Sequence, residues 1–302
     1  MSIVENWMLT EDQIQRYYDV GRVHSIAQTD HNGVWMLDTT HGRFVAKLGQ
    51  REDHLRLHFQ AQQALQDHGL HCNHVVPTAE DALLTPKGLA IFTWVPGESI
   101  QALDASRCDA VFTYLPAYFR ALAAVPCVEG DFCRRNGWDD AQSLDYLLKQ
   151  FPLQLADMPL TEVDRAVLAG AVDRLRIEQI RLQTLQRQLI HADLGPDNFL
   201  FDGSQVTAVI DFTPAYDCPL YAVAQFVYWN DLYPNPCTPR NVLLERLHAF
   251  APGAWSDGLM MAMLLRATLY RAAGPLLEMA HAGDVHQTRL RPRIECIRAL
   301  LS

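Results

Sequence analysis

Residues 189–212 of the chain read LIHADLGPDNFLFDGSQVTAVIDF, and no other segment is as informative about the structure. Its apolar and β-branched residues predict a short strand over Asn198–Phe201 and a returning strand over Val206–Phe212. Asp202-Gly203 between them is typical of a tight hairpin turn, because glycine adopts positive φ without steric cost. The segment is therefore predicted to form a β-hairpin.

The predicted hairpin brings three oxygen-bearing side chains together. Asp193 and Asn198 stand at the entry to one arm, and Asp211 stands at the end of the other. Two carboxylates and one carboxamide suit a hard divalent cation such as Mg²⁺ and do not suit Zn²⁺. Phosphoryl transfer needs such a cation and a carboxylate that orients the attacking hydroxyl. The alternative is a surface hairpin whose Asp and Asn side chains only form turns.

The order His-x-Asp-x-x-x-x-Asn, followed after the hairpin by Ile-Asp-Phe, resembles the aminoglycoside phosphotransferase superfamily, which includes choline kinases and kinase-like homoserine kinases. The resemblance covers about residues 20–280. It implies an α+β, two-lobed, protein-kinase-like fold with a small N-terminal antiparallel-sheet lobe and a larger, mainly helical C-terminal lobe. It also implies ATP and Mg²⁺ as cofactors. On this resemblance Asp193 is the catalytic base, Asn198 and Asp211 bind Mg²⁺, and His191 supports the loop.

The rest of the chain fits this division into two lobes. Residues 20–95 are predicted to run strand–strand–helix–strand–strand, and the chain is mainly helical after about Ile100. We place the lobes at residues 1–97 and 98–302. The predicted strands are 33–38, 43–48, 82–84 and 90–95, and the predicted helices are 10–18 with Thr10 as N-cap, 53–68, 107–124, 141–151, 161–187, 240–250 and 256–281.

The nucleotide-binding residues are expected on the N-terminal lobe. Lys47 resembles the strand lysine that contacts the α- and β-phosphates, although a lone lysine in a strand is more often an edge residue facing solvent. Asn32 resembles an asparagine of the kinase-like homoserine and aminoglycoside enzymes, and an ordinary hairpin turn explains it equally well. Phe92, Thr93 and Trp94 resemble the hinge whose backbone pairs with the adenine edge, and a strand with a Pro-Gly exit is the alternative.

One expected residue is missing from the nucleotide side. In the superfamily that the chain resembles, a glutamate on the next helix holds the strand lysine. Here His58 and Gln60 stand near the expected place, and the nearest acids are Glu52 and Asp53 at the start of the helix. Either Gln60 or Glu52 substitutes for the glutamate, or Lys47 is less rigidly placed and turnover is slow.

The acceptor side is expected after Asp211. Tyr228, Trp229 and Asp231 form an aromatic and acidic cluster that fits a pocket for an amine-bearing or sugar-like acceptor. The competing interpretation is that aromatic residues at helical spacing belong to the core. Asp217 is expected to cap or turn the chain and to have no catalytic role.

Composition narrows the partners and the compartment. The net charge is −10, so a nucleic-acid partner is not expected, because binding phosphates requires clustered Lys and Arg. The seven scattered cysteines include no C-x-x-C pair, which favours a reducing cytoplasm. No apolar stretch approaches the ~20 residues that span a bilayer, and the N-terminus lacks the pattern of a signal peptide. A cytoplasmic monomer or homodimer that acts on a small molecule is expected.

The function expected from these residues is transfer of the ATP γ-phosphoryl group to a hydroxyl of a small metabolite or antibiotic. Amino alcohols, homoserine-like compounds, sugars and aminoglycosides are all compatible with the scaffold, because one fold serves many acceptors. A degenerate kinase that binds nucleotide or metabolite as a sensor without turnover is the alternative. A protein kinase is a weaker alternative, because no Ala-Pro-Glu-like end of an activation segment follows Phe212.

Overall fold

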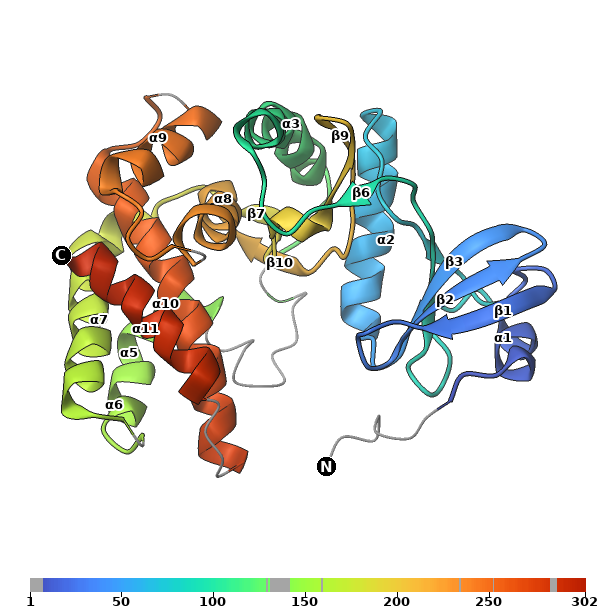
Figure 1. Cartoon of the computed structure of the whole chain (residues 1–302), viewed down its shortest axis with the longest axis horizontal. Helices are drawn as coiled ribbons and strands as arrows, with labels where there is room; N and C mark the ends of the chain where they lie inside the picture. Colours follow the sequence, from blue (N-terminus) through green and yellow to red (C-terminus); the bar gives the residue numbers. More distant parts are fainter. Residues whose placement is uncertain are drawn as a thin grey trace.

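The structure is a computed structural model that describes residues 8–128, 130, 142–158, 160–233, 235–251, 253–282 and 287–302, without the side chains of residues 278–282 and 287–289. Three parts of the sequence predictions lie outside the described residues. They are residues 1–7 of the N-terminal segment, Cys133 and the first residue of the helix expected at 141–151. Figure 1 shows a small lobe with the N-terminal sheet and a larger helical lobe, as the sequence predicts.

The N-terminal lobe is built on one antiparallel sheet. A capping box opens its first helix, because Thr10 Oγ1 accepts the Gln13 N–H while Gln13 Oε1 accepts the Thr10 N–H. The strands are hydrogen-bonded in the order β1-β2-β3-β5-β4. The elements are α1 (Glu11–Tyr17), β1 (Val23–Gln28), β2 (Val34–Thr39), β3 (Gly42–Lys47), α2 (Glu52–Asp67), β4 (Val75–Val76) and β5 (Ala90–Thr93).

One strand prediction in this lobe is wrong, and two strands were missed. Residues 82–84 form a loop, because the Thr78 N–H donates to the Ala82 carbonyl at 2.7 Å and Asp81 has a φ of 59°. The strand at this edge of the sheet is β4, which pairs with β5 through Val75–Val76. Strand β1 was not predicted either. A two-residue strand and a polar edge strand carry too little alternation to be recognised from sequence.

Helix α2 connects the lobes. Leu57 and Leu65 are buried in the large hydrophobic core that also contains the helices of the C-terminal lobe, while Leu55 packs with Phe92 of β5. In Figure 1 this helix stands between the N-terminal sheet and the helical lobe. The division at residues 97 and 98 remains a proposal, and the large core spans it.

The crossover between the lobes depends on a glycine. Gly97 has a φ of 146°, and a Cβ added there would lie 2.8 Å from Leu200 Cβ. The backbone of the crossover therefore approaches β8 more closely than any side chain allows. Immediately afterwards, β6 (Glu98–Ser99) pairs with β8, and Ser99 Oγ donates to the Asp197 carbonyl at 2.7 Å. This pairing fixes the crossover against the segment that carries Asp193 and Asn198.

The C-terminal lobe packs helices around α8 and α10. Its strands and turns are β7 (Gln188–His191), η2 (Pro196–Asn198), β8 (Phe199–Asp202), β9 (Gln205–Val209) and β10 (Pro214–Asp217). Its helices are α3 (Ala105–Ala123), α5 (Leu144–Lys149), α6 (Phe151–Leu155), α7 (Glu162–Gln183), α8 (Pro219–Val227), the π-turn η3 (Tyr228–Leu232), α9 (Arg240–Phe250), α10 (Asp257–Ala282) and α11 (Gln287–Leu301). Within the described ranges, no helix has the length and apolar character needed to cross a bilayer.

The helical predictions were correct in outline. α3, α7, α9 and α10 match four predicted helices within a few residues, whereas the helix expected at 141–151 is divided into α5 and α6 around Gln150. Helix α11 was not predicted.

Candidate active site

The site is organised around His191, at the end of β7. This side chain is fully buried. Its Nε2–H donates to the Ile210 carbonyl at 3.2 Å, and its Nδ1 accepts the Asp193 N–H at 3.2 Å. Burial lowers the pKa of His191, which agrees with a neutral ring that donates at one nitrogen and accepts at the other. His191 therefore ties the segment of Asp193 to the segment of Asp211, as a scaffold residue does.

The hairpin predicted from the sequence is present and brings its two ends together. The Ile210 N–H donates to the Asn198 carbonyl at 2.9 Å, and Asn198 Nδ2 donates to the Asp193 carbonyl at 2.6 Å. Asp202 still pairs with Gln205, so the turn is Gly203-Ser204, one residue later than predicted. Glycine at 203 supplies the positive φ of 60°. The returning strand ends at Val209, earlier than the predicted Phe212.

Asp211 interrupts the returning strand because its backbone is left-handed. Its φ is 56°, which is a strained conformation for a residue with a Cβ. The half-exposed carboxylate accepts a hydrogen bond from Lys47 Nζ at 2.5 Å. Burial favours the protonated acid, but Lys47 outweighs it and holds the pKa of Asp211 below its ordinary value. The structure thus joins the last residue of β3 to the Ile-Asp-Phe motif.

Asp193 is held by a donor from the helical lobe. Arg271 Nη2 on α10 donates to its Oδ1, and the Trp229 side chain lies beside the carboxylate and favours its ionised form. The carboxylate nevertheless keeps 49% of its side-chain surface exposed. Burial acts to raise the pKa of Asp193, but Arg271 and the hydrogen bonds hold it below the ordinary value. The residue is therefore an ionised carboxylate with room for a further ligand.

The donor set fits a hard cation. Asn198 uses its amide nitrogen on the Asp193 carbonyl, so its amide oxygen is the atom that remains for a cation, and Asp211 supplies carboxylate oxygens. Asp193 and Asp211 interact electrostatically, since each negative charge opposes ionisation of the other. Within the described ranges, no group of three or more His, Cys, Asp or Glu side chains is arranged to hold a metal by itself.

His58 occupies the region where a helix glutamate was expected. Its ring centroid lies 5.4 Å from that of Phe92 and 5.5 Å from that of Phe212, and its Nε2 lies 3.0 Å from the Asn73 carbonyl. A cavity of about 210 Å³ lies beside it, and Asp211 contributes to the lining. Gln60 and Glu52, the two suggested substitutes, are exposed. The acidic partner of Lys47 is Asp211.

His58 should make the protein acid-sensitive. Burial lowers its pKa to about 4, against about 6.5 in an unfolded chain. The unfolded chain therefore binds more protons between these values, so the stability contributed by neutral His58 is complete above pH ~6.5 and is lost towards pH ~4. We expect this residue to account for about 2–3 kcal/mol of the fall in unfolding free energy between pH 7 and 4.5. Denaturant unfolding of His58→Gln and of the parent at both pH values measures it.

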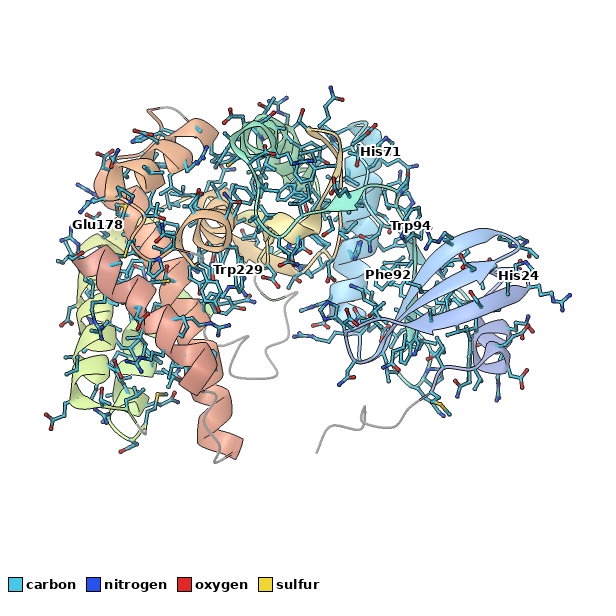
Figure 2. The ribbon with its side chains drawn as sticks, in the orientation of Figure 1. His24, His71, Phe92, Trp94, Glu178 and Trp229 are labelled. Atoms are coloured by element: carbon cyan, nitrogen blue, oxygen red, sulfur yellow. The ribbon has the colours of Figure 1, made fainter. Side chains whose placement is uncertain are left out.

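The matched control for this experiment is His24→Gln, because His24 is exposed on β1, as Figure 2 shows. It should keep the acid sensitivity of the parent. His191 is also buried and neutral, so His58→Gln should remove only part of the loss. The carboxylates of Asp193 and Asp211, whose pKa values are lowered, add their own loss only below about pH 4. An unchanged acid loss in His58→Gln would contradict the assignment.

The remaining nucleotide-side residues are placed as follows. Asn32 is exposed in the turn between β1 and β2. Phe92 is buried and faces His58, so only its backbone is available to a ligand. The Thr93 and Trp94 N–H groups donate to the carbonyls of His74 and Arg43, at 2.8 and 3.1 Å. The Thr93 and Trp94 N–H groups are therefore already engaged, and adenine can pair with them only if this backbone pairing opens.

The three acceptor-side candidates are separated by the structure. Trp229 lies next to Asp193, on the helical lobe in Figure 2. Tyr228 is 0% exposed and packs in the core, which excludes direct substrate contact in this conformation. Asp231 is only 11% exposed and lies 3.6 Å from Arg246, and partial burial raises its pKa. The sequence could not separate them, because the π-turn of η3 rotates successive side chains in a way that helical spacing does not predict.

Two arginines of α10 were missed by the sequence analysis. Arg271 binds Asp193, and Arg266 binds Asp217 with Nη–Oδ distances of 2.5 and 2.9 Å. Asp217 ends β10 and accepts the N–H of Cys218, the N-cap residue of α8, but α8 has no side-chain cap, so the expected cap or turn role is not observed and the ion pair with Arg266 takes its place. The sequence did contain a signal that these arginines have buried partners, because Arg266 and Arg271 are the only charged residues between Leu259 and Leu277. Charges inside a buried helix require partners.

Comparisons with solved structures agree with the fold. An aminoglycoside phosphotransferase, crystallised as a thermostable mutant in a ternary complex with ADP and hygromycin B, matches with a TM-score of 0.67, 17% identity and 96% coverage of each chain. A choline kinase from Streptococcus pneumoniae matches with a TM-score of 0.63, 12% identity and 96% coverage of each chain. At these identities the likeness establishes the protein-kinase-like fold.

Sequence comparisons identify relatives. A homoserine kinase of Rhizobium meliloti (strain 1021) is 26% identical over 225 residues, which cover 68% of this chain and 63% of the relative. A homoserine kinase of Brucella canis is 30% identical over 209 residues, which cover 65% of this chain and 60% of the relative. The match thus spans less than two thirds of the length of these relatives. The sequence model of the phosphotransferase enzyme family matches residues 23–255, and the chain therefore belongs to that family.

Proposed function

We propose that the protein transfers the γ-phosphoryl group of ATP to a hydroxyl group of a small molecule. The proposal is supported by direct contacts that join β3, the hairpin and the Asp193 loop. These contacts bring together Lys47, Asp211, Asn198 and Asp193. In this proposal Asp193 orients the acceptor hydroxyl and finally takes its proton, while Lys47 contacts the phosphates. Phosphoryl transfer relies mainly on such positioning and charge stabilisation.

Magnesium would be held by Asn198 and Asp211. The chemistry that such a cation would supply is neutralisation of the phosphate charge. Lys47 and Asp211 lie within hydrogen-bond distance of each other, and the proposal assigns Lys47 to the phosphates and Asp211 to the cation. His58 does not replace the glutamate, because an imidazole has no negative charge to pair with Lys47, and burial keeps its pKa low, at about 4.

The acceptor is proposed to be an alcohol that carries a cationic nitrogen. Homoserine and choline, the compounds named for a relative and a neighbour, each carry a hydroxyl and a cationic nitrogen, and hygromycin B, bound by another neighbour, is an aminoglycoside. A net charge of −10 favours the approach of a cationic substrate. Of the two aromatic candidates, the proposal assigns acceptor contact to Trp229. A cytoplasmic location and a monomeric or homodimeric state belong to the proposal, and size-exclusion chromatography with light scattering tests the latter.

A non-catalytic nucleotide or metabolite sensor is the second candidate. The absence of a helix glutamate beside Lys47 and the closed Lys47–Asp211 pair favour it. The retained set of Asp193, Asn198 and Asp211 supports the enzyme instead, because a sensor needs no base for an acceptor hydroxyl.

An acceptor screen distinguishes the two candidates. Purified protein with Mg·ATP is assayed for ADP formation against homoserine, choline, other amino alcohols, sugars and aminoglycosides. The proposed function predicts acceptor-dependent ADP formation that EDTA abolishes and excess Mg²⁺ restores. Thermal stabilisation by Mg·ATP without turnover on any acceptor would support the sensor. Turnover that persists in EDTA would contradict the proposed use of Asn198 and Asp211 as cation ligands.

A further inference from the structure

Arg271 is a buried cation whose partner lies at the edge of the active site. Its side chain is 7% exposed and projects from α10, a helix that is otherwise apolar over this turn. A buried guanidinium must be paired and hydrogen-bonded, since removing a charge from water costs several kcal/mol. Its ionic partner is Asp193, the proposed base, which remains half exposed. Arg271 therefore joins the helical core to the reacting carboxylate.

The guanidinium itself is fixed from several directions. Its Nε donates to Gln225 Oε1 at 2.7 Å, and Gln225 is fully buried on α8. The rings of Trp229 and Tyr270 lie 4.9 and 5.0 Å from its Cζ, so both aromatic rings contact the cation. The Arg271 backbone carbonyl accepts a hydrogen bond from Arg293 of α11 at 2.7 Å. These contacts leave the Arg271 side chain little rotational freedom.

We propose that Arg271, held by Gln225 and Trp229, is the positioning residue that fixes the Asp193 carboxylate for the acceptor hydroxyl. This inference rests on the proposed function. The terminal torsion of an aspartate is broad, so the carboxylate plane is not set by its own rotamer. The guanidinium binds Oδ1, and a carboxylate offers about four lone-pair sites. The remaining sites leave room for the acceptor hydroxyl, and the guanidinium fixes the orientation of the carboxylate that receives it.

The comparison with Arg266 separates positioning from plain stabilisation. Arg266 sits five residues earlier on the same helix and binds Asp217, whose side chain is only 12% exposed and also supports the start of α8. That pair is enclosed by protein. The guanidinium of Arg271 is equally buried, but it binds a carboxylate that faces the site. A pair serving stability alone gains nothing from leaving one partner half exposed, where water weakens the attraction.

Kinetic variants test the role. Arg271→Met should lower kcat by roughly 10- to 100-fold, because a displacement of about 1 Å at a reacting group costs about that much. The KM for ATP should stay within about 2-fold, because Arg271 contacts no predicted nucleotide residue. Arg271→Lys should recover part of kcat, since it restores the charge without the planar fork. Arg291→Met, an exposed arginine on α11, is the matched control and should keep parental kcat.

A double variant distinguishes positioning from a general loss of structure. If Arg271 acts through Asp193, adding Arg271→Met to Asp193→Asn should change kcat by less than about 2-fold, because the two residues act as one unit. The inference would be overturned if the losses in kcat multiplied in the double variant, or if Arg271→Met kept the parental kcat. In either case the proposed function would stand as long as the parent turns over an acceptor. No turnover by the parent on any acceptor refutes the proposed function, and this role with it.

Discussion

Replacing Asp193 with asparagine should reduce kcat by about 10²–10⁴-fold, the contribution of a positioned general base. The asparagine keeps the size of the side chain and one oxygen for Arg271, but it loses the negative charge that orients and finally deprotonates the hydroxyl. Mg·ATP affinity should change by less than about 3-fold, because Lys47, Asn198 and Asp211 stay in place. Steady-state kinetics with an identified acceptor measure the first quantity, and isothermal titration calorimetry measures the second.

The control for this experiment is Asp202→Asn. Asp202 has the same chemistry and lies in the same hairpin, but it is exposed beside the turn, away from His191. It should keep parental kcat. Full acceptor-dependent turnover by Asp193→Asn would rule out Asp193 as the base and would move the proposal to another carboxylate.

Replacing Asp217 with alanine should lower the free energy of unfolding by about 3–5 kcal/mol, the cost of leaving one member of a buried ion pair without its partner. Arg266 is 4% exposed, its Nη2 also donates to the Gln142 carbonyl at 2.9 Å, and its Cζ lies 4.3 Å from the Tyr221 ring. Without the carboxylate, its charge stays in the core. Denaturant-induced unfolding followed by circular dichroism measures the change.

Two companion variants make this test specific. Lys149→Met breaks the exposed Lys149–Asp145 pair on α5 and should cost less than about 1 kcal/mol. The double replacement Asp217→Leu with Arg266→Met should be more stable than Asp217→Ala, because apolar residues remove the uncompensated charge. A loss of less than about 1 kcal/mol in Asp217→Ala would show that the pair does not stabilise the junction of α8 and α10.

Short-range patterns explain why part of the molecule was predictable. The hairpin needed only two apolar runs and a glycine that tolerates positive φ, and Gly203 occupies that position although the turn is one residue later than expected. Thr10 is the N-cap of the first helix, as expected, for the same reason, because its partner Gln13 lies only three residues away. The proposed roles of Asp193, Asn198 and Asp211 came from the motif resemblance and remain proposals.

Other features were not accessible to such patterns. The loop at 82–84 was predicted as a strand because its residues are apolar, but the Thr78 backbone and side chain close it into a turn. Tyr228 and Trp229 are neighbours in sequence, yet one packs in the core and the other reaches Asp193, because the π-turn sets their directions. The partner of Lys47 was sought on α2 and was found on the hairpin, 164 residues away.

The sequence by itself determined the hairpin, the lobe order and the chemical types of the candidate ligands, because these depend on residues close together along the chain. The tertiary structure decided which charges meet. Arg271 is 78 residues from Asp193, and Arg266 is 49 residues from Asp217. Such pairs form only when α10 packs against α8 and the Asp193 loop, and burial then forces each guanidinium to find an anion. No local pattern encodes that choice, since any buried arginine of this helix needs a partner and only packing specifies which one.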